Sequence, residues 1–223
     1  MIVIKIGGHL LFREGSLRVD YIRGLLASLG DLASQRRVVA VVGGGVEARR
    51  YIGAGRRLGL SESHLDIIGI HVSRVNAALL HAAYHRVPPT IPESLEDASR
   101  LVGVYNPLFM GGLQPGQSTT TVAALVAEAL GASLYIATNV DGIYTDDPRR
   151  NPEAKLLREV TVSALKGMFE RASGAGGYSM LDTLTLNILE RSRIPALVFN
   201  GDPPSNIVRA VVAGDIGTRI VYT

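Results

Sequence analysis

The sequence predicts an α/β fold in which helices cover both faces of a mainly parallel sheet. Apolar, β-branched runs of strand length alternate with longer segments of helical periodicity. Such alternation is typical of βα units, whose crossover helices cover both faces of a parallel sheet. The 223 residues, of which 47% are hydrophobic and 19% charged, can close a large core within one domain.

Each element follows from its local pattern. Five runs are predicted to be buried strands: Ile2–Ile6, Val38–Val42, Leu101–Tyr105, Leu134–Thr138 and Ala196–Asn200. Helical periodicity between them predicts five helices: Val19–Leu32, Val46–Leu58, Leu65–His85, Thr120–Leu130 and Leu181–Arg191. Glycines at 174, 176 and 177 indicate a mobile loop. We expect a single domain over residues 1–223, in which any boundary between two lobes lies near Thr138–Pro148.

Composition excludes several classes of protein. No apolar run approaches the ~20 residues of a membrane-spanning helix, and the N-terminus lacks the features of a signal peptide. Zero cysteines exclude disulfides, thiolate metal sites and a cysteine nucleophile. The net charge of +3 comes without a basic tail or stripe, which disfavours nucleic acid but suits small anionic ligands. We therefore expect a cytoplasmic protein with neither nucleic-acid nor membrane partners.

Two predicted strands end in glycines that suit phosphate binding. Lys5 stands two residues before the pair Gly7 and Gly8, so backbone N–H groups and an ammonium can meet one anion. The second strand runs into residues 43–45, all glycine, before a helix that carries Arg49. Amides, the helix dipole and a guanidinium would converge there. The alternatives are a tight turn with a solvated lysine and a glycine turn packed close to the sheet.

Two further segments carry polar groups after a strand or before a helix. Residues 111–121 bring two glutamines and four consecutive hydroxyls to a helix N-terminus, where capping alone explains only one hydroxyl. The segment from Thr138 to Asp147 follows a strand, where open α/β folds bind ligands. Its Asp-Gly and Asp-Pro pairs are also ordinary turn signals. Tyr144 can either stack on a base or fill the core.

Two other patterns are weaker. His81 and His85 have the spacing of a helical metal pair, but no intervening glutamate and no third ligand accompany them, which disfavours zinc. Ser118 has no recognisable histidine partner, which disfavours a hydrolase.

Taken in order, these segments resemble the amino-acid-kinase superfamily, and within it the archaeal uridylate (UMP) kinases. The resemblance spans nearly the whole chain, and the ordered set is far more specific than any one motif. The residues that carry it are Lys5–Gly8, Val42–Gly45 with Ala48 and Arg49, Leu65–Asp66, Gly69–Ile70, Arg74–Ala77, Gly111–Thr119, Thr138–Pro148, Leu181–Asp182 and Glu190–Ser192.

The resemblance implies a three-layer αβα sandwich with an acceptor lobe over roughly residues 1–132 and an ATP lobe over roughly 133–223. It implies transfer of a phosphoryl group from ATP to UMP, with Mg²⁺ as cofactor, in pyrimidine nucleotide biosynthesis. It also implies a homo-oligomer, often a hexamer in relatives. UMP and ATP are the expected small-molecule partners.

The resemblance also assigns roles by position. Lys5 and Asp182 are expected to be catalytic, Lys5 at the transferring phosphoryl group and Asp182 orienting Lys5 or its partners. The residues expected to bind ATP are Gly8, His9, Gly45, Arg49, Thr138, Asn139, Tyr144 and Asp147. Those expected to bind UMP are Gly44, Asp66, Leu113, Gln114, Pro115, Gly116, Gln117, Ser118 and Thr119. No metal ligand is assigned.

Two positions depart from the family pattern. His9 stands where relatives more often carry serine or another small or basic residue, and Thr120 where many carry aspartate. Two rival functions stay open. One is a sister kinase acting on acetylglutamate, carbamate or isopentenyl phosphate, and the other is a nucleotide-binding sensor or storage protein.

Overall fold

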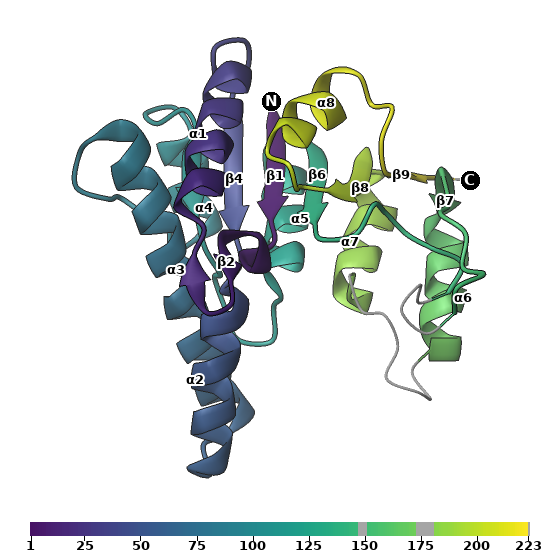
Figure 1. Cartoon of the computed structure of the whole chain (residues 1–223), viewed down its shortest axis with the longest axis horizontal. Coiled ribbons are helices and arrows are strands. Elements are labelled where there is room, and N and C mark those ends of the chain that lie inside the picture. Colours follow the sequence, from purple (N-terminus) through teal and green to yellow (C-terminus); the bar gives the residue numbers. More distant parts are fainter. Residues whose placement is uncertain (147–150, 173–180, 223) are drawn as a thin grey trace.

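The computed structural model describes residues 1–146, 151–172 and 181–222. A seven-stranded sheet forms the centre, with strand order β5-β4-β1-β6-β8-β9-β7 (Figure 1). All neighbouring strands pair in parallel except β8 and β9. The strands are β1 (Ile2–Ile6), β4 (Val38–Val42), β5 (Leu108–Met110), β6 (Ser133–Thr138), β7 (Glu159–Thr161), β8 (Ala196–Asn200) and β9 (Thr218–Val221), with a separate hairpin of β2 (Phe12–Arg13) and β3 (Ser16–Leu17).

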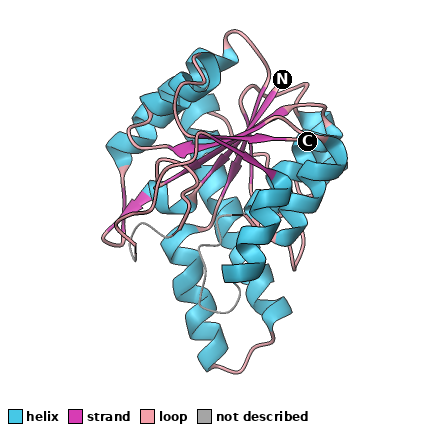
Figure 2. Cartoon of the chain, turned by 90° about the vertical axis from the view of Figure 1, so that its right-hand side faces the viewer, coloured by secondary structure: helices cyan, strands magenta, loops and turns pink. Residues whose placement is uncertain are grey.

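Helices lie on both sides of the sheet, as Figure 2 shows, which confirms the predicted three-layer sandwich. One face packs on α1 (Val19–Ala33), α3 (Glu62–His85) and α8 (Ser205–Val212). The other packs on α4 (Leu95–Leu101), α5 (Thr119–Ala129), α6 (Val162–Ala172) and α7 (Thr183–Ser192). The remaining helices, the 3-10 turn η1 (Gly8–Leu11) and α2 (Gly45–Arg57), begin next to the ends of β1 and β4.

Strand periodicity assigns the side chains of β1 to the two faces. Ile4 and Ile6 belong to the core under α1, whereas Val3 belongs to the core under α5. Successive side chains of a strand alternate between faces, so Lys5 emerges on the α5 side together with Val3. This register directs Lys5 toward the side of the sheet covered by α5, whose N-terminus carries the hydroxyls of residues 118–121.

One predicted strand, Leu101–Tyr105, is wrong. Leu101 is the last residue of α4, and the N–H groups of Val104 and Tyr105 donate to its carbonyl at 2.9 Å, which makes a turn. The real strand is β5, three residues later, between Pro107 and Gly111. An apolar run of this length has the same composition in a helix end as in a strand, so periodicity alone did not separate the two.

The other four predicted strands and all five helices are confirmed to within a few residues, while α4, α6, α8, β7, β9 and the β2–β3 hairpin were not predicted. The glycine segment at 174–177 and Asp147 lie outside the described residues. Within the described ranges, no helix has both the length and the apolar character needed to cross a membrane.

The two histidines with metal-pair spacing have packing roles in α3. His81 is fully buried, its ring centroid 4.7 Å from those of both His85 and Tyr105, and neither of its ring nitrogens has a hydrogen-bond partner. The Nε2 atom of His85 hydrogen-bonds to the Pro107 carbonyl at 2.8 Å. Burial, then the charge of His85, lowers the pKa of His81 below its ordinary value of 6.5.

We predict that His81→Leu makes the protein less sensitive to acid. Because the pKa of His81 is lower in the folded than in the unfolded chain, its neutral form stabilises the fold above pH ~6.5, and that contribution is lost as the pH falls. Between pH 7 and pH 5, the melting temperature of His81→Leu should fall less than that of the wild type. His64→Leu, at an exposed position of the same helix, is the control, and an equal fall in all three proteins would contradict the prediction.

Candidate active site

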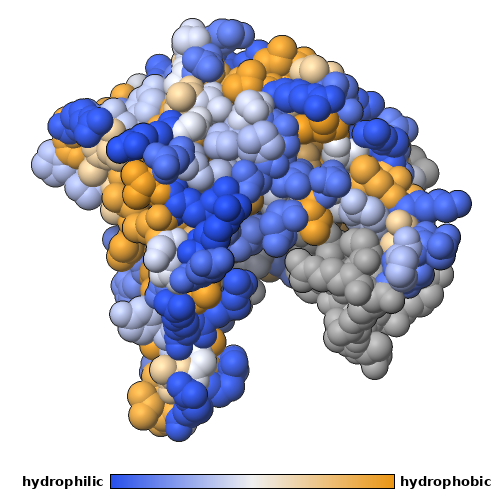
Figure 3. Space-filling model, viewed as in Figure 1, coloured by the Kyte–Doolittle hydropathy of each residue, from blue (hydrophilic) through white to orange (hydrophobic). Residues whose placement is uncertain are grey.

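The carboxyl ends of β4, β1 and β6 meet at one edge of the sheet. The chain leaves β1 to form β4 on one side and returns later to form β6 on the other, so β1 lies at a topological switch point. Open α/β sheets bind ligands in the crevice at such a point. In Figure 1 the arrows of β1 and β4 point toward the end where α2 begins, and Figure 3 shows the molecule hollowed beside α2.

The two glycine turns at this edge touch each other through their backbones. A Cβ atom on Gly8 would lie 2.2 Å from the Gly45 nitrogen and 2.4 Å from the Gly43 oxygen. Gly45 has φ +68°, and a Cβ there would lie 2.7 Å from the carbonyl group of Gly8. Only glycine avoids these clashes, so the predicted turns after β1 and β4 form one unit.

Helix α3 supports the turn after β4 from behind. The side-chain amide of Asn76, 5% exposed, donates to the Gly43 carbonyl at 2.9 Å. One turn earlier, Ser73 Oγ accepts from the Gly112 N–H at 2.7 Å. Sequence reasoning named Asn76 as part of a motif but gave it no role, because a buried amide that holds a turn is indistinguishable in sequence from any polar helix residue.

Lys5 is the cation at the centre of this edge. It pairs in register with Val41 and Ile136, which both lie in the core under α5. Burial lowers the pKa of Lys5 from 10.5 to about 8. Among the described residues Lys5 has no carboxylate partner. Its ammonium is therefore poorly solvated and suits an anionic ligand.

Asp182 joins the N-termini of α5 and α7. It is the N-cap of α7, accepting from the Thr185 N–H at 2.7 Å, and it also accepts from Ser118 Oγ at 2.5 Å and Thr121 Oγ1 at 2.8 Å. Burial would raise the pKa of Asp182, but these hydrogen bonds hold it below its ordinary value. The described partners of Asp182 do not include Lys5, so its predicted effect on Lys5 would run through the loop before α5.

The loop of residues 113–119 is held by α3 and α5. Asp66 Oδ2, on α3, accepts from the Gly116 N–H at 2.7 Å, and Ser118 Oγ caps α5 by accepting from the Thr121 N–H at 3.0 Å. Thr119 lies against the glycine turn, since a Cβ on Gly43 would be 3.4 Å from Thr119 Oγ1. Leu113 packs on the core, and Gln114, Pro115 and Gly116 are exposed. The Oε1 atom of Gln117 is buried and has no hydrogen-bond partner among the described residues.

The remaining predicted residues surround this centre. The His9 ring lies over Gly7, Arg49 is exposed on α2, and Gly44 packs against Ala48. Thr138 is buried at the end of β6, next to β1, and Asn139 beside it is exposed. Tyr144 is half-buried, and its hydroxyl donates to Asp141 Oδ2 at 3.4 Å.

Together, the switch point, the fused glycine turns and a Lys5 without a carboxylate partner among the described residues define an α/β protein suited to hold phosphate groups. The chain belongs to the amino acid kinase family, which matches residues 1–200.

Similar proteins agree with this assignment. The chain is 55% identical over 213 residues to the uridylate kinase of Thermofilum pendens, which covers 94% of this chain and 92% of that protein. It is 45% identical over 203 residues to the uridylate kinase of Sulfolobus acidocaldarius, covering 89% of this chain and 88% of that protein. The crystal structure of uridylate kinase from Archaeoglobus fulgidus superimposes with a TM-score of 0.88 at 37% identity, covering 99% of this chain and 100% of that one.

We predict that Lys5→Met stabilises the ligand-free protein. The variant removes an ammonium that folding desolvates, so its melting temperature at pH 7 should exceed that of the wild type. The pKa of Lys5 is lower in the folded than in the unfolded chain. Wild-type stability should therefore rise as the pH increases from about 8 toward 10.5, and the advantage of the variant should shrink.

Melting curves at pH 7 and pH 9.5 measure both effects. Lys155→Met, at an exposed position, is the control and should leave the melting temperature nearly unchanged. A Lys5→Met protein that melts below the wild type at pH 7 would show that the ammonium stabilises the empty site.

Proposed function

We propose that this chain is a uridylate kinase that transfers the γ-phosphoryl group of ATP to UMP and releases ADP and UDP. The observation that carries the proposal is the contact between the two glycine turns at the switch point. Beside that contact lie Lys5, which meets no carboxylate in the described part of the chain, and the 113–119 loop, which is held by Asp66. Relatives up to 55% identical are uridylate kinases.

The residues present suit a reaction between two anions. The acceptor oxygen of a nucleoside monophosphate is already ionised near neutral pH, because its second pKa is ~6, so no general base is needed. The barrier comes from repulsion and from misalignment of the two phosphates, and positioning with charge neutralisation lowers it. Lys5, the amides of the glycine turns, the N-terminus of α2 and Arg49 would supply that neutralisation.

We assign the site residues as the resemblance suggests. Lys5 and Asp182 act at the transferring group and around it. Gly8, His9, Gly45, Arg49, Thr138, Asn139, Tyr144 and Asp147 bind ATP, and Gly44, Asp66 and the residues from Leu113 to Thr119 bind UMP. The acceptor lobe then spans roughly residues 1–132, which also supply Gly8, His9, Gly45 and Arg49 to the ATP phosphates, and the ATP lobe spans roughly residues 133–223. The contact of Asp66 with the Gly116 N–H supports the assignment of Asp66 and the 113–119 loop to one acceptor site.

We propose that Mg²⁺ enters with ATP. No group of three or more histidine, aspartate or glutamate side chains in the described ranges could hold a metal by itself. Such a site fits Mg²⁺, which usually keeps several waters and is bound through substrate phosphates with only one or two protein carboxylates. When bound, the ion would neutralise charge on the transferred phosphoryl group.

We further propose that the protein is a homo-oligomer that pairs through α3. Three apolar side chains on one face of this helix stay exposed: Ile67 by 40%, Val75 by 67% and Leu79 by 40%. A second copy would cover them. The hexamer, the cytoplasmic location and the place in pyrimidine biosynthesis stay predictions.

Coupled release of ADP tests the function. The protein, with ATP and Mg²⁺, is offered UMP, CMP, AMP, GMP, isopentenyl phosphate, acetylglutamate, carbamate or no acceptor. Strong turnover with UMP alone supports the proposal. Turnover with a different acceptor would retain the phosphate site but overturn the role of Asp66 and the 113–119 loop. Binding of ATP without turnover on any acceptor would favour the sensor or storage protein.

We predict that Lys5→Ala lowers kcat with UMP on the order of 10²–10³-fold, the cost of losing one preorganised donor of positive charge. The steady-state rate of ADP release measures it, with Lys155→Ala as the exposed control. Near-normal turnover of Lys5→Ala would exclude the role given to Lys5.

We predict that Asp66→Ala raises the KM for UMP far more than the KM for ATP. The carboxylate holds the loop at Gly116 through one oxygen and leaves the other for the ribose hydroxyls. Glu62→Ala, at an exposed position of the same helix, should change neither constant. Equal increases of the two KM values for Asp66→Ala would refute the assignment.

A further inference from the structure

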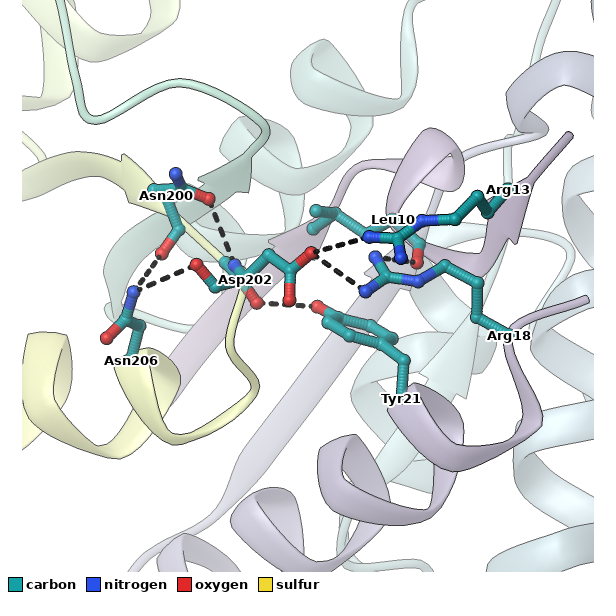
Figure 4. A network of polar contacts seen from close by, with 8 residues as sticks. Leu10, Arg13, Arg18, Tyr21, Asn200, Asp202 and Asn206 are labelled. Atoms are coloured by element: carbon teal, nitrogen blue, oxygen red, sulfur yellow. Dashed lines mark hydrogen bonds and ion pairs between the residues drawn. The ribbon is translucent and has the colours of Figure 1, made fainter.

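A polar network next to β8 joins two turns that lie far apart in the sequence (Figure 4). At one end, Arg18 donates to Asp202 Oδ2 at 2.8 Å and to the Leu10 carbonyl at 3.2 Å. Leu10 belongs to η1, the turn that begins with Gly8 and His9. The Arg18 side chain is 18% exposed and that of Asp202 is 35% exposed, so their ion pair is partly shielded from solvent. Asp202 therefore holds η1 through Arg18.

At the other end, the network reaches the turn after β6 through Asn200. The Asn200 Oδ1 atom accepts from the Asp202 N–H at 3.0 Å, and its Nδ2 atom donates to Asp141 Oδ1 at 3.0 Å. A backbone hydrogen bond connects the same two segments, since the Gly201 N–H donates to the Thr138 carbonyl at 2.8 Å. The segment 200–202 thus contacts both η1 and the turn that begins at Thr138.

Two helices fix this connecting segment in place. Tyr21, 6% exposed on α1, donates from its hydroxyl to the Gly201 carbonyl at 2.7 Å. From α8, Asn206 donates to the carbonyls of Asn200 at 3.0 Å and Asp202 at 3.3 Å. Figure 4 shows Arg18 and Tyr21 on one side of Asp202, and Asn200 and Asn206 on the other. The segment has little freedom to move independently of α1 and α8.

We propose that Arg18, Asp202 and Asn200 form a positioning bridge that sets the distance between η1 and the 138–141 turn. The inference rests on the proposed function, in which both turns hold ATP, one at the phosphates and the other at the adenosine. The three residues are positioning residues, because they would act on ATP through η1 and the 138–141 turn, which they hold by hydrogen bonds. None of those contacts reaches the 113–119 loop, so the bridge acts on ATP and not on UMP.

The bridge predicts an effect confined to one substrate. Removing the Asp202 carboxylate leaves the half-buried Arg18 without this counter-ion and releases η1 from the segment after β8. Small displacements of a group that orients a substrate are costly, so the KM for ATP should rise on the order of tenfold in Asp202→Ala. The KM for UMP should stay within about twofold of the wild type. Asp202→Asn, which can still accept from Arg18, should recover part of the loss.

The experiment combines steady-state kinetics with direct titration of ATP. Asp215→Ala is the matched control, since it breaks the exposed ion pair of Asp215 with Arg209 on α8 without touching either turn. Asn200→Asp, which sets two carboxylates against each other at Asp141, is a second variant should Asp202→Ala fail to fold. It should also raise the KM for ATP selectively.

The outcomes distinguish a failure of the positioning bridge from a failure of the proposed function. Selective loss of ATP affinity in the Asp202 and Asn200 variants, with Asp215→Ala unchanged, supports the bridge. If the wild type binds ATP and phosphorylates UMP but the variants bind ATP equally well, the bridge is refuted and the network only braces α1 against α8. Parallel increases of both KM values refute it as well. A wild type that does not bind ATP refutes the proposed function itself.

Discussion

The structure depends above all on the direct backbone contact between the glycine turns of β1 and β4. Neighbouring parallel strands end about 4.8 Å apart, which leaves no room for two side chains where both chains turn at once. With Gly8 against Gly43 and Gly45, the turns close together. They present amides at the start of α2, where the helix dipole is positive. The positions of Lys5 and Thr119 follow, because both are fixed relative to these turns.

Around that contact, neutral donors hydrogen-bond to the carboxylates, and within the described ranges no carboxylate pairs with the central cation, Lys5. Asp182 accepts from two hydroxyls and an amide, and Asp66 accepts from the Gly116 N–H. Burial disfavours the charged form of Lys5, and its pKa is lowered for that reason. A site that has not neutralised its own charge attracts anions, and this suits phosphoryl transfer between two nucleotides better than it suits chemistry that needs a base.

Sequence predicted the parts of this arrangement that local patterns encode. The strands β1 and β4 were placed to the residue, because buried parallel strands are uninterrupted β-branched runs, and the glycines after them marked the phosphate turns. The Leu101–Tyr105 run was misassigned because its apolar composition did not reveal that its N–H groups bond backward to Leu101. The hydrogen bond between Arg18 and Asp202 spans 184 positions, and neither periodicity nor spacing carries information on such a pair. The support of Gly43 by Asn76 was missed for the same reason.

The most direct test of the central contact is the rate of UMP phosphorylation by Gly8→Ala, measured beside Gly53→Ala. A methyl group at Gly8 would lie 2.2 Å from the Gly45 nitrogen, whereas one at Gly53, within α2, meets nothing within 4 Å. Gly8→Ala should lose on the order of 10²-fold or more in turnover, because the two turns can no longer close together, while Gly53→Ala should keep wild-type activity. A Gly8→Ala protein that phosphorylates UMP at the wild-type rate would contradict this prediction.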